Sequence, residues 1–161
     1  MTQQPIKSYT VCFLFNQTLD KVLLILKIAT EFRGQLNGIG GKIEPNETPF
    51  EGALREIEEE SGVSVVRNLM WLGTLHLPHN CEKPDIPDNG LSDPACILYY
   101  FAGIVPDDQT VKTPDGGETV DWYETDAVLA SRVTDATFAG NGDVQYFVGR
   151  GFDALSRHKT E

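Results

Sequence analysis

Residues 41–63 of this chain read GKIEPNETPFEGALREIEEESGV, and this stretch does the most to decide the fold. Thr48 is expected to cap the start of a helix, because a proline follows it and Glu51, three residues after the cap, completes a capping box. The helix should continue to about Ser61, since Gly62 supplies the left-handed residue that commonly follows a last turn. The stretch therefore predicts a loop followed by one well-capped helix.

Acidic side chains are predicted to lie beside the apolar stripe of this helix. Glu56, Glu59 and Glu60 stand at positions i, i+3 and i+4, so their carboxylates project from one side. Like charges at these spacings cost roughly 0.2–0.5 kcal/mol per pair. Arg55 is the single basic residue of the helix, and it can brace one carboxylate while leaving the others free for a cation. The apolar residues expected to pack the helix on a sheet are Phe50, Ala53, Leu54 and Ile57.

The chemical type of these side chains predicts a hard metal ion. Oxygen ligands without imidazole or thiolate partners favour Mg²⁺, with Mn²⁺ as a substitute, over Zn²⁺. The chain holds 24 Asp and Glu against 13 Lys and Arg, a net charge of −11, so neither a nucleic acid polymer nor a membrane is expected as a partner. A phosphate-rich substrate would also be repelled unless a bound cation stood between it and the protein. Taken singly, each glutamate is better explained as a surface side chain, and only the spacing of the set favours a metal site.

The rest of the sequence predicts a single α/β domain over residues 1–161. The first two apolar runs are joined by a short NQTLD segment, which predicts a hairpin. Both runs are apolar at nearly every position, which is typical of strands covered by helices on both faces. A glycine-rich segment follows at 34–41, where the backbone must bend sharply or be approached closely. Strands are expected at 9–15, 21–28, 69–77, 96–104 and 119–123.

The C-terminal part is expected to end in one more helix. It should begin near Asn141 and leave residues 156–161 as a frayed tail. The Pro- and Asp-rich segment 78–94 is expected to be a lid or a mobile loop. Three cysteines without CxxC spacing predict neither a disulfide framework nor a zinc site, and together with the lack of a leader or membrane-spanning run they favour a cytoplasmic location. The side chains expected to point inward from the last helix are Val144, Phe147, Val148 and Leu155.

A longer pattern joins the first helix to the loop before it. It can be written G-x5-E-x7-R-E-U-x-E-E-x-G-U, where U is a bulky aliphatic residue, and every fixed position is matched from Gly41 to Val63. A chance match in a chain of this length has a probability on the order of one in ten million. Two nucleotide-binding glycine motifs fail, because Leu36 stands where a P-loop needs its first glycine and Ile43 stands where GxGxxG needs its last.

This pattern resembles the signature of the Nudix hydrolases, and the resemblance extends to the strands on either side of it. It implies an α/β/α sandwich with a mixed β-sheet. It also implies attack of water at phosphorus in a nucleoside diphosphate linked to another group, with Mg²⁺ bound by the signature. By the same resemblance Arg55 orients a carboxylate, and Glu56, Glu59 and Glu60 ligate metal or deprotonate water. Glu47 matches a position with an indirect or structural role.

The metal site implied by the resemblance includes a residue from outside the signature. Family members often recruit a further carboxylate from another loop, and the segment PDGGETVDWYE offers Glu118, which we favour, and Asp121. A metal ion there would neutralise phosphate oxygens and activate a water molecule as the nucleophile. The expected metal positions are Gly41, Glu56, Glu59, Glu60 and Glu118.

The segment that begins LNGIGGK and runs through the signature resembles, more narrowly, MutT-like enzymes that hydrolyse oxidised purine nucleoside triphosphates to a monophosphate and pyrophosphate. Asn37 matches an asparagine that reads the base, and a residue that closes a turn is an equally good explanation. Asp143 loosely matches an acidic residue that binds the purine, although a helix cap explains it better. Trp122 is a candidate for stacking on a base or for the core. Lys27 and Arg33 are candidates for phosphate contacts or for ordinary surface residues.

Two alternatives stay open at the level of sequence. One is a non-catalytic nucleotide-binding or regulatory module on the same fold, although such proteins commonly lose signature carboxylates that this chain keeps. The other is a Nudix enzyme for ADP-ribose or dinucleoside polyphosphates, for which no secondary signature is recognised. A monomer or a homodimer is expected in either case.

Overall fold

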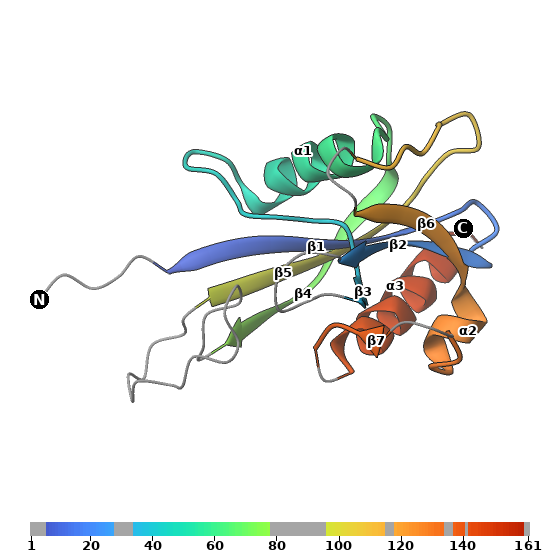
Figure 1. The fold of residues 1–161 in the computed structure, drawn as a ribbon. Helices are drawn as coiled ribbons and strands as arrows, with labels where there is room; N and C mark the ends of the chain where they lie inside the picture. The colour runs from blue at the N-terminus through green and yellow to red at the C-terminus, as the bar shows by residue number, and fades with distance from the viewer. Residues whose placement is uncertain are drawn as a thin grey trace, which may run out of the picture.

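A curved mixed β-sheet lies between two helices (Figure 1). The computed structural model describes residues 6–27, 34–77, 96–114, 118–133, 137–140 and 142–159. The strands within them are β1 (Lys7–Phe15), β2 (Lys21–Lys27), β3 (Gln35–Asn37), β4 (Arg67–Leu77), β5 (Cys96–Ile104), β6 (Thr119–Glu124) and β7 (Thr137–Phe138). The helices are α1 (Pro49–Ser61), α2 (Thr125–Leu129) and α3 (Asp143–Lys159). The predicted α/β class with a mixed sheet is confirmed.

The strand order places β1 inside the sheet, between β5 and β2. The order is β4-β5-β1-β2-β3-β7, and β6 pairs with β2 outside this path. β1 is parallel to β5 along its whole length. The predicted hairpin between β1 and β2 is present, but these strands pair only next to their shared turn, and β2 then continues between β3 and β6. The two strands therefore diverge, and the glycine-rich segment after β3 takes the place beside β1.

β1 sends side chains into two hydrophobic clusters, one on each face of the sheet. Phe13 and Phe15 belong to the cluster that includes α3 residues, whereas Cys12 and Leu14 belong to the cluster that includes α1 residues. Successive side chains of a strand point to opposite faces, so a strand that is apolar at every position is buried on both. The predicted covering of the sheet by helices on both sides is thus confirmed.

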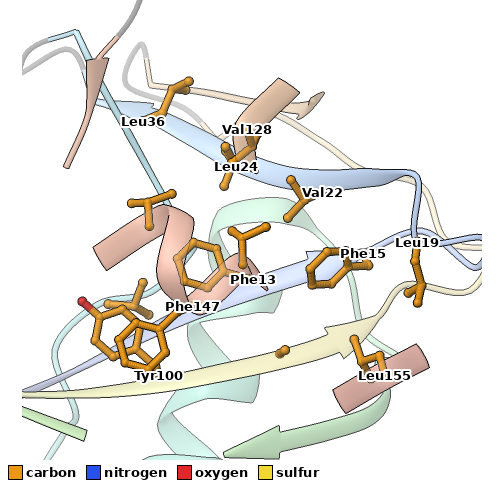
Figure 2. Close-up of a cluster of buried hydrophobic side chains, with 14 of the residues drawn as sticks. Phe13, Phe15, Leu19, Val22, Leu24, Leu36, Tyr100, Val128, Phe147 and Leu155 are labelled. Carbon is orange, nitrogen blue, oxygen red and sulfur yellow. The ribbon is translucent and has the colours of Figure 1, made fainter. Parts of the chain in front are cut away.

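The cluster on the α3 side is centred on aromatic rings (Figure 2). The ring of Tyr100 from β5 stacks on the ring of Phe147 from α3, with centroids 3.8 Å apart and an interplanar angle of 7°. Burial raises the pKa of the Tyr100 hydroxyl, and the nearby charge of Asp143 raises it further. The four inward residues predicted for this helix are all buried or nearly so: Val144, Phe147, Val148 and Leu155. The predicted frayed tail is wrong, because α3 continues to Lys159.

The helix α1 begins and ends where its local signals predict. The Thr48 hydroxyl accepts from Glu51 N at 3.1 Å and Glu51 Oε1 accepts from Thr48 N at 3.0 Å, which closes the capping box. Gly62 ends the helix with φ of 75°. The predicted packing stripe is too wide, because Phe50 is 46% exposed and Leu54 is 39% exposed. The buried face is centred on other residues of the helix, namely Gly52, Ala53, Ile57 and Ser61.

Several smaller features depart from the sequence expectations. The short elements β3, α2 and β7 carry too few residues for a periodic pattern and were not predicted. Cys96 is disulfide-bonded, so the expectation of no disulfide is wrong at this residue, whereas Cys12 is a free buried thiol. The predicted lid or loop at 78–94 and the predicted helix start at Asn141 lie outside the described residues. Among the helices that the structure describes, none is long and apolar enough to cross a membrane.

Candidate active site

The glycine-rich segment before α1 is fixed to the central strand β1 by backbone hydrogen bonds. Ile39 and Cys12 exchange two of them, at 2.6 and 2.9 Å, and Thr10 N donates to Gly41 O at 2.9 Å. A Cβ on Gly40 would stand 1.8 Å from Thr10 O, so only glycine fits there. The close approach predicted for this segment is therefore an approach of two backbones, and it fixes Gly41 beside β1.

Gly41 in turn makes room for a carboxylate from the middle of α1. A Cβ on Gly41 would stand 2.5 Å from Glu56 Oε1 and 2.5 Å from Glu56 Cδ. The missing side chain thus forms a cradle for the Glu56 carboxylate. The Gly41 carbonyl accepts from Thr10 N at 2.9 Å and from the Thr10 hydroxyl at a long 3.5 Å, so Gly41 could contribute this oxygen to a metal site only by giving up the longer bond.

Arg55 donates hydrogen bonds to several carboxylates of an acidic cluster formed by Glu47, Glu56, Glu59 and Glu60. Its Nε and NH2 atoms donate to the two carboxylate oxygens of Glu47 at 3.0 and 2.6 Å, and NH2 also donates to Lys42 O at 2.9 Å. Its NH1 atom donates to Glu56 Oε1 at 2.9 Å and to Glu59 Oε2 at 3.1 Å. Arg55 therefore braces three carboxylates rather than the one expected. The paired hydrogen bonds to Glu47 are the geometry in which a guanidinium is held most firmly.

The hydrogen bonds of Arg55 lower the pKa of Glu47 to about 2, which makes Glu47 a permanent anion that anchors the arginine. Its position in the signature is thus explained as structural, in agreement with the role that the resemblance implies. Glu56 is in a different environment, because burial raises its pKa and Arg55 only partly offsets this. Glu59 is 57% exposed at its side chain and lies at the open side of the cluster.

Glu60 lies away from Glu47, the residue that anchors Arg55, and against the glycine-rich segment. Its Oε2 accepts from Gly40 N at a long 3.4 Å. Burial raises the pKa of Glu60 to about 7, the positive charge of Lys27 lowers it, and the carboxylates of Glu56 and Glu118 raise it. The carboxylate is thus largely desolvated without a strong partner, a state that a bound cation would relieve.

Glu118, the expected carboxylate from another loop, lies at this same side. It immediately precedes β6, and the pairing of β6 with β2 brings it next to Lys27, the last residue of β2. Lys27 Nζ is 3.6 Å from Glu118 Oε2, and the two side chains are 27% and 28% exposed. The residues predicted to contact phosphate and metal thus contact each other.

The donor chemistry of this cluster suits a hard divalent cation. All its side-chain donors are carboxylate oxygens, one of them is cradled by a glycine, and Glu56 and Glu59 reach the same guanidinium nitrogen. Within the part of the chain that the structure describes, however, no three His, Cys, Asp or Glu side chains converge as a ready metal site. The carboxylates contact Arg55, Gly40 N and Lys27 instead, so binding of a cation would require their side chains to rotate.

The residues proposed to contact the base lie at the β3–β7 edge of the sheet. Asn37 ends β3, and its Oδ1 accepts from Gly38 N at 2.8 Å, so part of its amide is used to close a turn. Ala139 N donates to Leu36 O at 2.9 Å, which brings the segment before α3 beside β3. Asp143 is the first residue of α3. The two candidates therefore come from neighbouring segments. Arg33 lies outside the described residues.

The carboxylates and Trp122 lie beside two different cavities. A cavity of about 550 Å³ adjoins the end of α1, with Glu59 and Glu60 on one side and residues 112–114 on the other. Lys112, which no sequence signal marked, is held there by a hydrogen bond of 2.8 Å from its backbone N–H to Ser61 O. Trp122 lines a smaller cavity of about 260 Å³, whose described lining includes no residue of α1, and it packs against the α1-side core. The core explanation of Trp122 is thus the better supported.

Comparison with known proteins identifies the family of proteins to which this chain belongs. The family model of the NUDIX domain matches residues 6–139, so the chain belongs to the NUDIX family. Over 46 residues the chain is 49% identical to the oxidized purine nucleoside triphosphate hydrolase of Mus musculus, a match that covers 29% of this chain and 30% of that protein. The chain thus matches less than a third of the length of that curated relative.

Two solved structures share the fold. A MutT/nudix family protein from Enterococcus faecalis is similar with a TM-score of 0.69 and 17% identity, over 98% of this chain and 64% of that chain. The NUDIX domain of Shewanella oneidensis NrtR, complexed with ADP ribose, is similar with a TM-score of 0.65 and 18% identity, over 96% and 90% of the two chains. The predicted family and fold are confirmed.

Proposed function

We propose that this protein is a Mg²⁺-dependent Nudix pyrophosphohydrolase that converts a purine nucleoside triphosphate, including oxidised forms, to a nucleoside monophosphate and pyrophosphate. The observation that carries the proposal is the cluster in which Arg55 holds the carboxylates of Glu56 and Glu59, with the Glu56 carboxylate in the Gly41 cradle. A solvated acidic face would not need a guanidinium anchored in this way.

The side chains divide the work between anchoring and reaction. Glu47 fixes Arg55, and Arg55 fixes the direction of the Glu56 and Glu59 carboxylates. Glu60, with its raised pKa, is able to hold a proton near neutral pH. When bound among these oxygens, Mg²⁺ would neutralise phosphate charge and lower the pKa of a coordinated water.

The acceptance of a purine triphosphate rests on two supports. One is the local identity to the oxidized purine nucleoside triphosphate hydrolase of Mus musculus. The other is Asn37, whose Nδ2 group stays available to an acceptor on a base while its Oδ1 is held by Gly38 N. Lys27 and Arg33 are proposed as phosphate contacts, and Asp143 as a contact to the purine.

A second candidate is binding or hydrolysis of ADP-ribose. The fold similarity to the NrtR domain complexed with ADP ribose favours including this ligand. A binding module without turnover is the related non-catalytic alternative, and the intact set of carboxylates argues against it.

The test is a panel of ordinary and oxidised dNTPs, ADP-ribose, dinucleoside polyphosphates and NADH, assayed with Mg²⁺ and with products identified. Release of pyrophosphate from a purine triphosphate is the expected result. Glu59→Gln should lower kcat by about 100-fold or more, because it removes a ligand that acts in the transition state. Glu58→Gln is the matched control, since Glu58 lies one residue away, is exposed and occupies a variable position of the signature. Full activity of Glu59→Gln, or binding of nucleotides without any turnover, would refute the proposal.

A further inference from the structure

Two of the described basic side chains near the carboxylates, Arg55 and Lys27, are held very differently. Arg55 donates five hydrogen bonds of 2.6 to 3.1 Å, two of them to the single carboxylate of Glu47. Lys27 makes one ion pair of 3.6 Å with Glu118, with about a quarter of each side chain exposed. A single ion pair of this length contributes little stability, whereas the anchored guanidinium cannot leave without breaking its whole set of bonds.

Lys27 also acts on the carboxylate that is most in need of a counter-ion. Its charge lowers the pKa of Glu60, while the neighbouring Glu118 raises it, so the three side chains form one electrostatic group. In this group the ammonium of Lys27 is the positive charge that balances two carboxylates. Its long aliphatic stem lets the ammonium move without any movement of β2.

On the basis of the proposed function, we propose that Lys27 is an internal counter-ion that a divalent cation displaces from Glu118, and that the displaced ammonium is then available to a phosphate of the substrate. A divalent cation carries two positive charges, whereas the single ammonium of Lys27 neutralises only part of the negative charge of Glu60 and Glu118. The exchange occurs at Lys27 rather than at Arg55 because only Lys27 is loosely held. Lys27 is thus a substrate-binding residue whose phosphate contact depends on the metal.

This exchange gives the site an order of binding. Before the cation is bound, Lys27 is occupied by Glu118 and adds little to phosphate affinity. After the cation is bound, the protein gains both the metal charge and a free ammonium on the same side of the cluster. Binding of cation and of phosphate should therefore be cooperative in this acidic protein.

Mn²⁺ binding measured by electron paramagnetic resonance tests the exchange without any turnover. Lys27→Met should raise the affinity of the weakest Mn²⁺ site by about two- to fivefold, the range expected for loss of a weak ion pair. Glu118→Gln should weaken that site, and in the Glu118→Gln background the effect of Lys27→Met should be clearly smaller, because only the influence of Lys27 on Glu60 remains. Lys21→Met is the matched control, because Lys21 begins the same strand, is exposed and carries the same charge.

Binding of inorganic pyrophosphate, measured by calorimetry, tests the second half. With Mn²⁺ present, Lys27→Met should bind pyrophosphate about tenfold more weakly than the wild type, as for the loss of a hydrogen bond to a charged group. Without a metal the two proteins should bind it equally.

Two results would overturn the exchange alone. One is an effect of Lys27→Met on Mn²⁺ affinity that is equally large in the Glu118→Gln background. The other is a loss of pyrophosphate affinity that is the same with and without Mn²⁺. Failure of the wild type to bind any Mn²⁺ would be a different outcome, since it would overturn the proposed metal-dependent function itself.

Discussion

Replacing Gly40 or Gly41 by alanine adds the same methyl group at adjacent positions, and the two variants should fail in different ways. On Gly40 the new Cβ would stand 1.8 Å from Thr10 O and 2.6 Å from Thr10 C. Ordinary contact begins near 3.4 Å, so the overlap is 3.4 − 1.8, or 1.6 Å, and both atoms belong to the backbone of β1. Relief requires β1 or the glycine segment to move.

The Gly40→Ala variant should therefore lose stability. Overpacking of this kind costs about 3 kcal/mol. For a chain of this length, that corresponds to a fall in Tm of roughly 6 to 12 °C. The measurement is thermal unfolding followed by circular dichroism. An unchanged Tm would mean that the glycine segment is not fixed against β1 in the way described.

The Gly41→Ala variant should stay folded and lose activity. Its Cβ would meet the Glu56 carboxylate at 2.5 Å, which is 0.9 Å short of ordinary contact, but this carboxylate ends a flexible side chain and can rotate away. Rotation breaks the 2.9 Å bond from Arg55 NH1 to Glu56 Oε1. A displacement of about 1 Å in a catalytic group can cost on the order of 100-fold in rate.

The assay is Mg²⁺-dependent release of pyrophosphate. The kcat/KM of each variant that keeps the Tm of the wild type is compared with that of the wild type. Gly149→Ala serves as the control, because Gly149 lies in α3 and its new Cβ would make only an ordinary contact of 3.6 Å with Leu129. This variant should keep its activity and be slightly more stable. A Gly41→Ala variant with wild-type kcat/KM would refute the role given to the cradle.

Two further predictions concern stability. Burial raises the pKa of Glu60 from 4.5 to about 7. In the metal-free protein, the folded chain therefore binds this proton more tightly than the unfolded chain does. The free energy of unfolding should thus decrease as the pH rises from about 4.5 through 7. Urea unfolding in EDTA at several pH values should show a smaller decrease for Glu60→Gln, and equal slopes for both proteins would contradict the burial of this carboxylate. Thr48→Ala should lower the free energy of unfolding by about 1 kcal/mol, because the capping box is lost, and urea unfolding without such a change would contradict the cap.

The helix α1 was predictable almost residue for residue because its signals are local. The capping threonine, the proline after it and the final Gly62 each act within one turn of the chain. The exposure of Phe50 and Leu54 was not predictable in the same way, since periodicity marks an apolar stripe but does not tell how much of it the sheet covers.

The site was predictable in its residue types more than in its contacts. The spacing of the glutamates indicated a shared face, and Arg55 indicated a brace. The anchoring of Arg55 by Glu47 required the loop conformation, and the pairing of Lys27 with Glu118 required the register of β2 against β6. Contacts of this second kind depend on how distant strands align, and no local pattern records that alignment.

The capping of α1 by its own end residues has a consequence for how this protein can change. The groups that hold the helix at its two ends are the Thr48 and Glu51 side chains and the bond from Gly62 N–H to the backbone carbonyl of Glu58, and none of them uses the exposed side chains of Glu58 and Glu59. Substitutions at Glu58 or Glu59 therefore leave the helix termini intact. Natural variation can retune the reactive surface in small steps while the scaffold beneath it persists.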